Sequence, residues 1–275
     1  MTDKKGNLEP ASSDTMLSAT DLVLDLLSTH DRHELSVAAL CHAGELCGLR
    51  AQNVRVALNR LQRQQRVVSP ERGLYRLDTA TSGLFGEVES WLRREQRVQD
   101  WHGGWAAVLD TAVPRRDKTA WRRHERALAL RGFRPLGDSG LRLRPDNLSG
   151  GVAGLRKDLA RLGLAGEARV FVVTELSPAD DKQARRLWDG AALKQQYRRL
   201  SRQLAASHKT LSRRPEADAA AESLRLGRAA IRLILLDPLL PDTLIDNRPR
   251  QELAERMGAY QRDAKAIWMR LLEQV

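Results

Sequence analysis

A short arginine-rich stretch contains the residues of this chain whose chemistry is most specific. Between Leu49 and Leu77 the sequence has seven arginines and one acidic residue. Helical spacing over residues 51–63 gathers the apolar side chains on one side and the polar ones on the other. The polar side suits DNA base edges, because arginine pairs with guanine, asparagine and glutamine pair with adenine, and an apolar side chain contacts the thymine methyl. The predicted base-contacting residues are Gln52, Arg55, Val56 and Asn59.

The arginines at the ends of this helix and beyond it suit a second kind of contact. Phosphate oxygens accept hydrogen bonds from guanidinium groups without reporting base sequence, so such contacts position a protein on DNA. The predicted phosphate-contacting residues are Arg50, Arg60, Arg63, Arg66, Arg72 and Arg76. The alternative for an isolated basic helix is a solvated face, and the neighbouring elements argue against that alternative.

Those neighbouring elements form a recognisable scaffold. Residues 18–29 and 34–46 have the caps and apolar spacing of two helices that precede the arginine-rich helix, and short turns join all three. Residues 66–78 place two β-type runs around a Ser-Pro-Glu-Arg-Gly turn, which predicts a hairpin. Three helices followed by a basic hairpin predict a winged helix-turn-helix domain at residues 18–80, preceded by a disordered polar tail at residues 1–17.

In the middle of the chain the spacing of apolar residues changes from a helical pattern to an alternation of strand and helix patterns. Residues 81–100 have helical spacing and are expected to be a helical connector. Residues 101–177 then alternate between strand and helix patterns: a strand at 104–110, a helix at 115–133 ended by Gly132, two extended pieces at 134–145, a helix at 151–164 and a buried strand at 169–176. The order βαββαβ predicts a ferredoxin-like domain.

The remaining residues, 178–275, read as entirely helical, including one helix that begins near residue 180. A proline-punctuated loop from Asp237 to Pro249 is rich in leucine and is expected to pack against the helices. The fold class expected for the whole chain is therefore α+β and multidomain, with a winged helix-turn-helix, a ferredoxin-like domain and an all-α carboxy-terminal domain in that order.

Composition agrees with a nucleic-acid partner. The net charge is +11 and the isoelectric point is about 10.3, so a polyanion is the expected partner. The two cysteines, Cys41 and Cys47, are too few for a disulfide framework or a structural zinc site. The polar amino-terminal stretch has no apolar signal, and no apolar run is long enough for a membrane span. These features predict a cytoplasmic protein with no membrane association.

Several short motifs then appear in a characteristic order: Trp101-x-Gly103-x-Trp105, Leu187-Trp188-Asp189, and the loop Asp237-Pro238-Leu239-Leu240-Pro241. Together with the domain order, they resemble the PaaX family of bacterial transcriptional regulators over nearly the whole chain. The resemblance implies a homodimeric repressor with amino-terminal DNA-binding domains, a Cas2-like middle domain and a helical carboxy-terminal domain. The best-known members control phenylacetate catabolism and release DNA on binding phenylacetyl-coenzyme A. After the loop, where the family usually has Trp-Pro-Gly, this chain has Asp-Asn-Arg-Pro-Arg-Gln.

An effector of that kind, an aryl- or acyl-coenzyme A thioester, would need an aromatic pocket and cations for its phosphates. The predicted effector-binding residues are Trp101, Trp105, Trp188, Arg185 and Arg198, while Arg186 and Arg199 suit the same phosphates. The alternative for these arginines is a solvated helix face.

An enzymatic function of the middle domain is the alternative. In the Cas2 fold an aspartate at the end of the first strand can bind a divalent metal, and Asp110 occupies that place here. The sequence shows no second carboxylate near it, and a strand-end carboxylate can equally cap the following turn or helix. No catalytic nucleophile motif, phosphate loop, histidine metal spacing or cofactor motif is recognised. We therefore predict a non-enzymatic operator-binding regulator without a cofactor or metal. A metal-dependent nuclease or general nucleic-acid-binding protein that uses the middle domain is the alternative.

Overall fold

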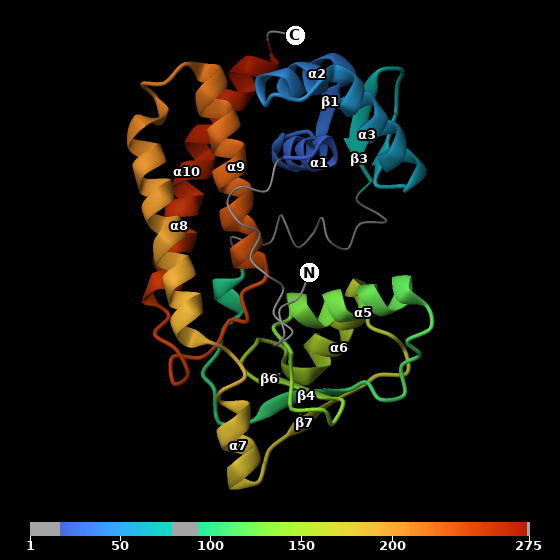
Figure 1. The fold of residues 1–275 in the computed structure, drawn as a ribbon, viewed down its shortest axis with the longest axis vertical. Coiled ribbons are helices and arrows are strands. Elements are labelled where there is room, and N and C mark those ends of the chain that lie inside the picture. Colours follow the sequence, from blue (N-terminus) through green and yellow to red (C-terminus); the bar gives the residue numbers. More distant parts are fainter. Residues whose placement is uncertain (1–16, 79–92, 274–275) are drawn as a thin grey trace. The chain divides into compact units, whose positions relative to one another are not determined.

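The structure, a computed structural model, describes residues 17–78 and 93–273 of the chain (Figure 1). These residues form a mixed α/β structure with two small antiparallel sheets and a helical carboxy-terminal region. They divide into two compact units, one of residues 93–197 and 233–251, the other of residues 17–78, 198–232 and 252–273. The predicted tail lies outside the described residues except at residue 17, as does most of the predicted connector, because residues 79–92 are not described.

The arginine-rich region contains three helices and a three-stranded sheet. Their bounds are α1 Ala19–Thr29, β1 Glu34–Ser36, α2 Val37–Leu46, α3 Ala51–Arg63, β2 Val67–Val68 and β3 Leu74–Leu77, and the strand order is β1-β3-β2. The three predicted helices and the hairpin are confirmed. The predicted start of the second helix at residue 34 is wrong, because Ser36 caps α2 by accepting from the Ala39 amide and residues 34–36 pair with β3 instead.

The apolar sides of these helices form the core as the spacing predicts. Ser18 caps α1, and α1 buries Leu22, Val23, Leu26 and Leu27. On α3 the buried residues are Val54, Ala57, Leu58 and Leu61. Helices α2 and α3 approach closely at Gly44, where an added Cβ would lie 2.6 Å from Cγ2 of Val54. The side of α3 that faces the core is therefore fixed.

The larger sheet belongs to the other unit. Its elements are β4 Trp105–Leu109, α5 Lys118–Leu130, β5 Arg134–Pro135, β6 Leu141–Pro145, α6 Gly151–Leu162 and β7 Arg169–Val173. The strands run β5-β6-β4-β7, and every neighbouring pair is antiparallel. The order βαββαβ predicted from the sequence is present. Helices α5 and α6 pack their buried leucines on the same face of the sheet, against Ala106 and Val108 of β4 (Figure 1).

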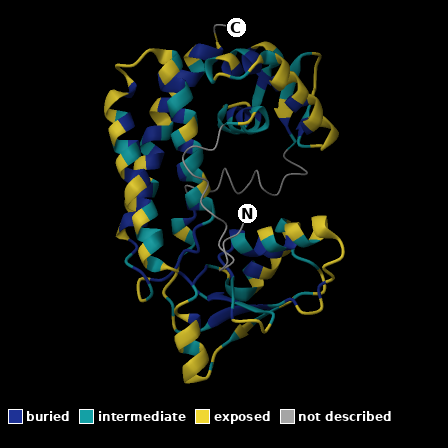
Figure 2. Ribbon diagram, in the orientation of Figure 1, coloured by how far each residue is buried: buried dark blue, intermediate teal, exposed yellow. Residues whose placement is uncertain are grey.

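Two local predictions for this unit are wrong. The described end of the connector forms the 3-10 helix η2 Glu95–Arg97 and an isolated bridge between Val98 and Leu148 rather than a continued α-helix. The strand expected to be buried, β7, lies at the edge of the sheet with β4 as its single neighbour. None of its residues is buried, and Val172 is 38% exposed, because an edge strand lacks the second neighbour that would cover it (Figure 2).

The carboxy-terminal helices are α7 Pro178–Ala184, α8 Gly190–Leu211, α9 Glu216–Leu235 and α10 Arg248–Leu272. The single helix expected from near residue 180 is wrong: the chain breaks between α7 and α8 at Leu187-Trp188-Asp189. Trp188 turns inward there and donates its indole N–H to the carbonyl of Gly132 at 3.2 Å. The expectation that the proline loop packs inward is confirmed, since Asp237–Pro241 are all buried. No helix in residues 17–78 or 93–273 combines the length and the apolarity that crossing a bilayer requires.

Candidate nucleic-acid interface and polar clusters

The four predicted base-contacting residues share one exposed side of α3. Gln52, Arg55, Val56 and Asn59 are all exposed, opposite the four buried residues of the same helix. Val56 is 56% exposed, and among the described residues only one other large apolar side chain, Val172, is strongly exposed. The structure thus places guanine-, adenine- and thymine-compatible side chains side by side on one helical surface.

The predicted phosphate-contacting arginines surround that surface. Arg50 stands at the N-cap of α3, Arg60 and Arg63 lie in its last turn, and the other three lie in or beside the hairpin. Five are exposed, and Arg66 is half-buried. Arg60 donates to the hydroxyl of Thr20, and Arg76 forms an ion pair with Glu34 at 3.2 Å. Arg50, Arg63 and Arg72 are also exposed, at the start of α3, at its end and in the hairpin turn, respectively.

The turn before α3 is built from glycine and backbone contacts. Gly48 has φ of +76°, a conformation that glycine adopts without strain, and the Leu49 amide donates to the Gly44 carbonyl at 2.8 Å. Both cysteines near this turn are free thiols. Burial raises the pKa of Cys47 to about 11, so this thiol stays protonated and unreactive at neutral pH.

The three tryptophans predicted to bind an effector come together. The rings of Trp105 and Trp188 are stacked with centroids 6.3 Å apart, and Trp101 meets Trp105 edge-on at 5.0 Å. The Arg185 guanidinium lies 5.0 Å from the centre of the Trp101 ring. Trp105 and Trp188 are only 1% and 8% exposed, so their rings fill this space rather than line an open pocket. Arg198 is exposed on α8 and belongs to the other compact unit.

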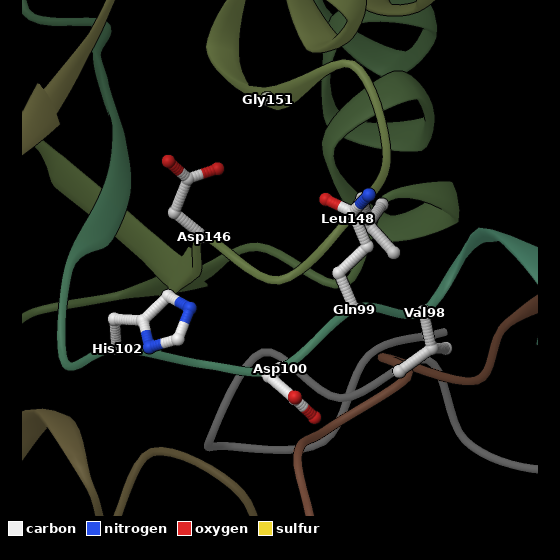
Figure 3. A pocket seen from close by; sticks show the side chains of 7 residues that line it. All are labelled: Val98, Gln99, Asp100, His102, Asp146, Leu148 and Gly151. Carbon is white, nitrogen blue, oxygen red and sulfur yellow. The ribbon is translucent and has the colours of Figure 1, made fainter.

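An open hollow lies elsewhere in the same unit, and sequence reasoning missed it. Its lining residues are Val98, Gln99, Asp100, His102, Asp146, Leu148 and Gly151 (Figure 3). None of the predicted effector-binding residues is among them. The carboxylates of Asp100 and Asp146 would repel the phosphates of a coenzyme A thioester, so the hollow does not match the predicted ligand.

Asp110 is part of a buried charged cluster. Its Oδ2 accepts from Arg142 Nε at 2.7 Å and lies 3.4 Å from His124 Nε2, while Arg142 Nη2 donates to Glu125 at 2.5 Å. The Ala165 amide donates to His124 Nδ1 at 3.2 Å, which places the imidazole proton on Nε2. Asp110 does not cap α5, since Asp117 accepts from the Thr119 and Ala120 amides.

The expectation that no second carboxylate lies near Asp110 is wrong. Possible ligand atoms of Asp110, His124 and Glu125 lie within 4.8 Å of one another. The Arg142 guanidinium, however, already binds both carboxylates and supplies the positive charge that a metal would bring. Hard divalent cations prefer six or more oxygen ligands. The arrangement is that of a buried ion-pair cluster that fixes α5 against β4 and β6.

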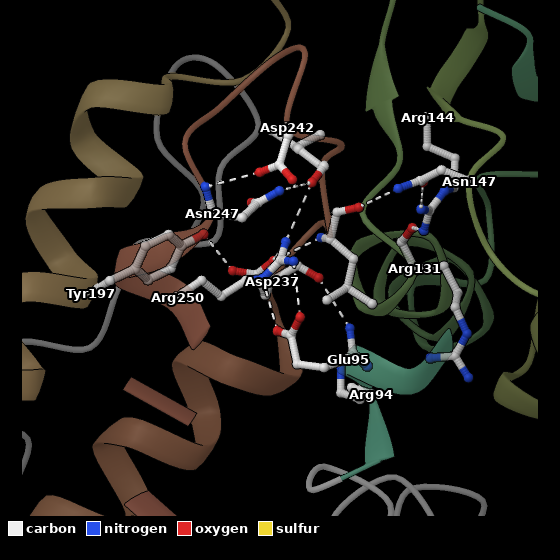
Figure 4. A network of polar contacts seen from close by, with 12 residues as sticks. Arg94, Glu95, Arg131, Arg144, Asn147, Tyr197, Asp237, Asp242, Asn247 and Arg250 are labelled. Carbon is white, nitrogen blue, oxygen red and sulfur yellow. Dashed lines mark hydrogen bonds and ion pairs between the residues drawn. The ribbon is translucent and has the colours of Figure 1, made fainter. Parts of the chain in front are cut away.

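A second polar network holds the proline loop (Figure 4). Tyr197 donates to Asp237, and Asn147 donates to the Leu239 carbonyl at 2.8 Å. Arg250 binds both carboxylate oxygens of Glu95, at 2.8 and 3.0 Å. These contacts join segments that are far apart in the sequence. The only hint of them in the sequence is that polar residues, such as Asp237 and Asn247, interrupt the leucine-rich loop.

Arg144 is the most deeply buried cation of that network. Its guanidinium donates to two backbone carbonyls and to Asn147 Oδ1. Burial, together with the nearby charges of Arg94 and Arg131, lowers the pKa of Arg144 to about 9. The three guanidinium groups lie close enough for their charges to interact, and Arg131 also pairs with Asp158 at 3.2 Å.

Comparison with known proteins identifies a carboxy-terminal domain and a similar fold. Residues 188–270 match the family model described as the PaaX-like protein C-terminal domain. A solved structure, that of the uncharacterized protein Rv0674 from Mycobacterium tuberculosis, is 23% identical, covers 94% of this chain and 98% of that chain, and superposes with a TM-score of 0.57, which shows a shared fold. No curated protein matches the sequence. Over residues 188–270, therefore, the chain carries a PaaX-like carboxy-terminal domain.

Proposed function

We propose that this chain is a DNA-binding transcriptional regulator that acts in the cytoplasm as a homodimeric repressor. The observation that carries the proposal is the exposed surface of α3, where Arg55, Val56 and Asn59 offer three kinds of base contact on one face. Exposed arginines at both ends of the helix suit the flanking phosphates. The PaaX-like domain at residues 188–270 supports the regulatory class, because that family consists of regulators.

The proposal assigns a role to each domain. Residues 18–80 are the winged helix-turn-helix, residues 81–100 the connector, residues 101–177 the ferredoxin-like, Cas2-like dimerisation domain, and residues 178–275 the helical domain. A two-fold dimer would present two α3 helices to the half-sites of an approximate palindrome in the operator.

Release from DNA is assigned to a small-molecule effector, such as phenylacetyl-coenzyme A. Its aryl group would bind among Trp101, Trp105 and Trp188, and Arg185 would meet its phosphates. Because two of these rings are buried, binding requires them to separate, which couples the ligand to a different conformation. By linkage, the effector must weaken DNA binding by the same factor by which DNA weakens effector binding.

One observation favours a second candidate function. The grouping of Asp110, His124 and Glu125 could hold a divalent cation in a metal-dependent nuclease. The ion pairs of Arg142 with both carboxylates oppose it, since a metal would have to displace the guanidinium.

Charge reversal on α3 tests the proposed function. Arg55→Glu should abolish binding of the full chain to duplex DNA at moderate salt, because a carboxylate would face the base edges and phosphates. Arg262→Glu makes the same charge change at an exposed position of α10 and is the matched control. Fluorescence anisotropy with a labelled duplex measures both. Equal losses for the two variants would show that net charge alone drives binding and would contradict the proposal.

A further inference from the structure

Helix α5 presents a second basic surface, which the proposed function does not use. Its exposed cations are Arg115 and Arg116, just before the helix, and Lys118, Arg122 and Arg123 within it; together they are called the α5 basic face. None of the five forms an ion pair within residues 17–78 and 93–273. The helical rise of about 1.5 Å per residue places Lys118 and Arg122 about 6 Å apart along one side of the helix. Lys118 and Arg122 therefore lie on one side of α5, while Arg123 lies about 100° further round the helix.

Two acidic side chains, Asp117 and Glu125, lie at the start of α5 and within it. The Asp117 carboxylate accepts from two amides at the start of the helix, and these hydrogen bonds hold the pKa of Asp117 below its usual range. Glu125 is bound by Arg142 in the buried cluster. Glu125 is therefore paired away from this face, while Asp117 keeps its negative charge near Arg123 and offsets one of the five positive charges.

Several contacts hold the α5 basic face in place. The Arg115 guanidinium lies 4.7 Å from the centre of the Trp121 ring, which stacks on His124 at 5.1 Å. His124 is itself held by Asp110 and by the Ala165 amide. The Arg123 side chain passes over Gly163, where an added Cβ would lie 2.3 Å from Arg123 Cδ. The buried cluster around Asp110 therefore serves to present this surface.

We propose that the α5 basic face is a second DNA-binding surface, which contacts the phosphate backbone of duplex DNA without reading its sequence. An exposed group of five cations with one offsetting carboxylate complements a polymer that carries regularly spaced phosphates. A lipid surface suits it less, because a membrane-bound helix needs an exposed apolar side and α5 has buried Ala127, Leu128 and Leu130 in the core. The inference extends DNA binding beyond α3 and rests on the proposed function only for the choice of duplex DNA as the polyanion.

The test neutralises the part of this face that makes no packing contact. The triple variant Arg116→Gln, Lys118→Gln, Arg122→Gln is compared with wild type in the full chain, by measuring duplex affinity at several salt concentrations. Each phosphate contact contributes about 0.9 to the slope of log affinity against log salt, so the slope should become shallower by about 2 to 3. The matched control is Arg202→Gln, Lys209→Gln, Arg262→Gln, which removes the same charges from exposed positions of α8 and α10. Its slope should stay at the wild-type value.

The readouts separate this inference from the function assigned to α3. Sequence preference, measured by selection from random duplexes, should be the same in the triple variant and in wild type. The inference would be overturned if the salt dependence of DNA affinity were unchanged in the triple variant, or if it became equally shallow in the control variant. This holds even if wild type selects a DNA sequence. A shallower slope in the triple variant alone, with no sequence selected by any form, would support the inference while contradicting the function assigned to α3. Binding to phosphatidylserine vesicles that is lost in the triple variant, with an unchanged DNA slope, would reassign the face to a membrane and overturn it.

Discussion

Trp105 and Trp188 lie with their indole planes 2° apart and their centroids 6.3 Å apart, one on β4 and the other between α7 and α8. Each ring N–H has a partner, Asp181 for Trp105 and the Gly132 carbonyl for Trp188. The pair joins the sheet to the segment that opens the PaaX-like domain. Its first role is packing, and any effector that binds there must compete with that packing.

Truncating Trp188 should therefore be costly even without an effector. Trp188→Ala should lower the free energy of unfolding by about 3 to 5 kcal/mol, because a large buried ring is replaced by a cavity. Urea denaturation followed by circular dichroism measures this loss. Trp188→Phe keeps an aromatic ring and should lose clearly less. A loss below about 1 kcal/mol in Trp188→Ala would show that the rings are loosely packed and open to ligand.

A glycine holds the proline loop close to the end of α5. Gly132 has φ of +73°, and an added Cβ would lie 2.6 Å from Pro238 Cα. Gly132→Ala should therefore destabilise the protein by about 1 to 3 kcal/mol through backbone strain and this clash. Gly166→Ala is the control, because no atom lies within 4 Å of its added Cβ. Equal melting temperatures for the two variants would refute the close approach.

The carboxyl group of Asp25 makes stability depend on pH. Burial raises its pKa from 3.8 to about 6, although Arg228 donates to it at 2.7 Å and opposes the rise. Asp21 faces the same guanidinium at 2.5 Å. Between about pH 4 and 6 the folded protein keeps a proton that the unfolded chain has lost, so stability falls as the pH rises through this window. Above about pH 6 the Asp25 carboxyl no longer changes the free energy of unfolding as the pH rises.

Asp25→Asn removes that titration. The urea midpoint of wild type, relative to that of the variant, should fall between pH 4 and 6 and then stay level. Taking the difference between wild type and variant removes the pH dependence that groups independent of Asp25 contribute to both proteins. A difference that rises with pH over the same window would mean that the ion pair with Arg228 outweighs burial.

The cluster at Asp110 is expected to be structural. Asp110→Asn should destabilise the protein by about 3 kcal/mol, since it leaves Arg142 with Glu125 alone and weakens the support of His124. Removing divalent cations from wild type with a chelator should leave the melting temperature unchanged. If Mn²⁺ raised the melting temperature of wild type but not of Asp110→Asn, and wild type cleaved DNA, the nuclease would become the better account.

The division between base and phosphate contacts makes a further prediction. Arg55→Ala should weaken binding to the selected site by about 1 to 3 kcal/mol and relax the preference at one base pair. Arg72→Ala should weaken binding to selected and unrelated duplexes by similar factors. Competition binding with both duplexes measures the difference. Equal effects of the two variants on every sequence would remove the distinction.

Local sequence patterns correctly predicted the features of the fold that depend on residues close together in the chain. Helix α3 begins and ends at the predicted residues, because its apolar period and its flanking turns are local signals. Strand β1 was missed because its partner, β3, lies about forty residues further along, and three residues carry too little pattern. The apolar run in β7 did not reveal its place at the edge, since strand order is set by the whole sheet.

The candidate sites, too, were predictable only where they depend on local spacing. The exposed face of α3 follows from the helical period alone, and the structure places all four predicted residues on it. The contact of Asp110 with Glu125 through Arg142 joins β4, α5 and β6, so no spacing rule could predict it. The tryptophan motifs were correctly grouped, but only packing shows that two of the three rings are buried.

The central claim is that α3 reads a DNA sequence, and selection from a pool of random duplexes tests it most directly. The purified full chain is incubated with the pool at several salt concentrations, and the retained fraction is sequenced. The account predicts an enriched inverted repeat whose half-sites lie about one or two helical turns apart. Retention without enrichment, disappearing steeply as salt increases, would mean that the arginines contact the backbone alone and would contradict the claim.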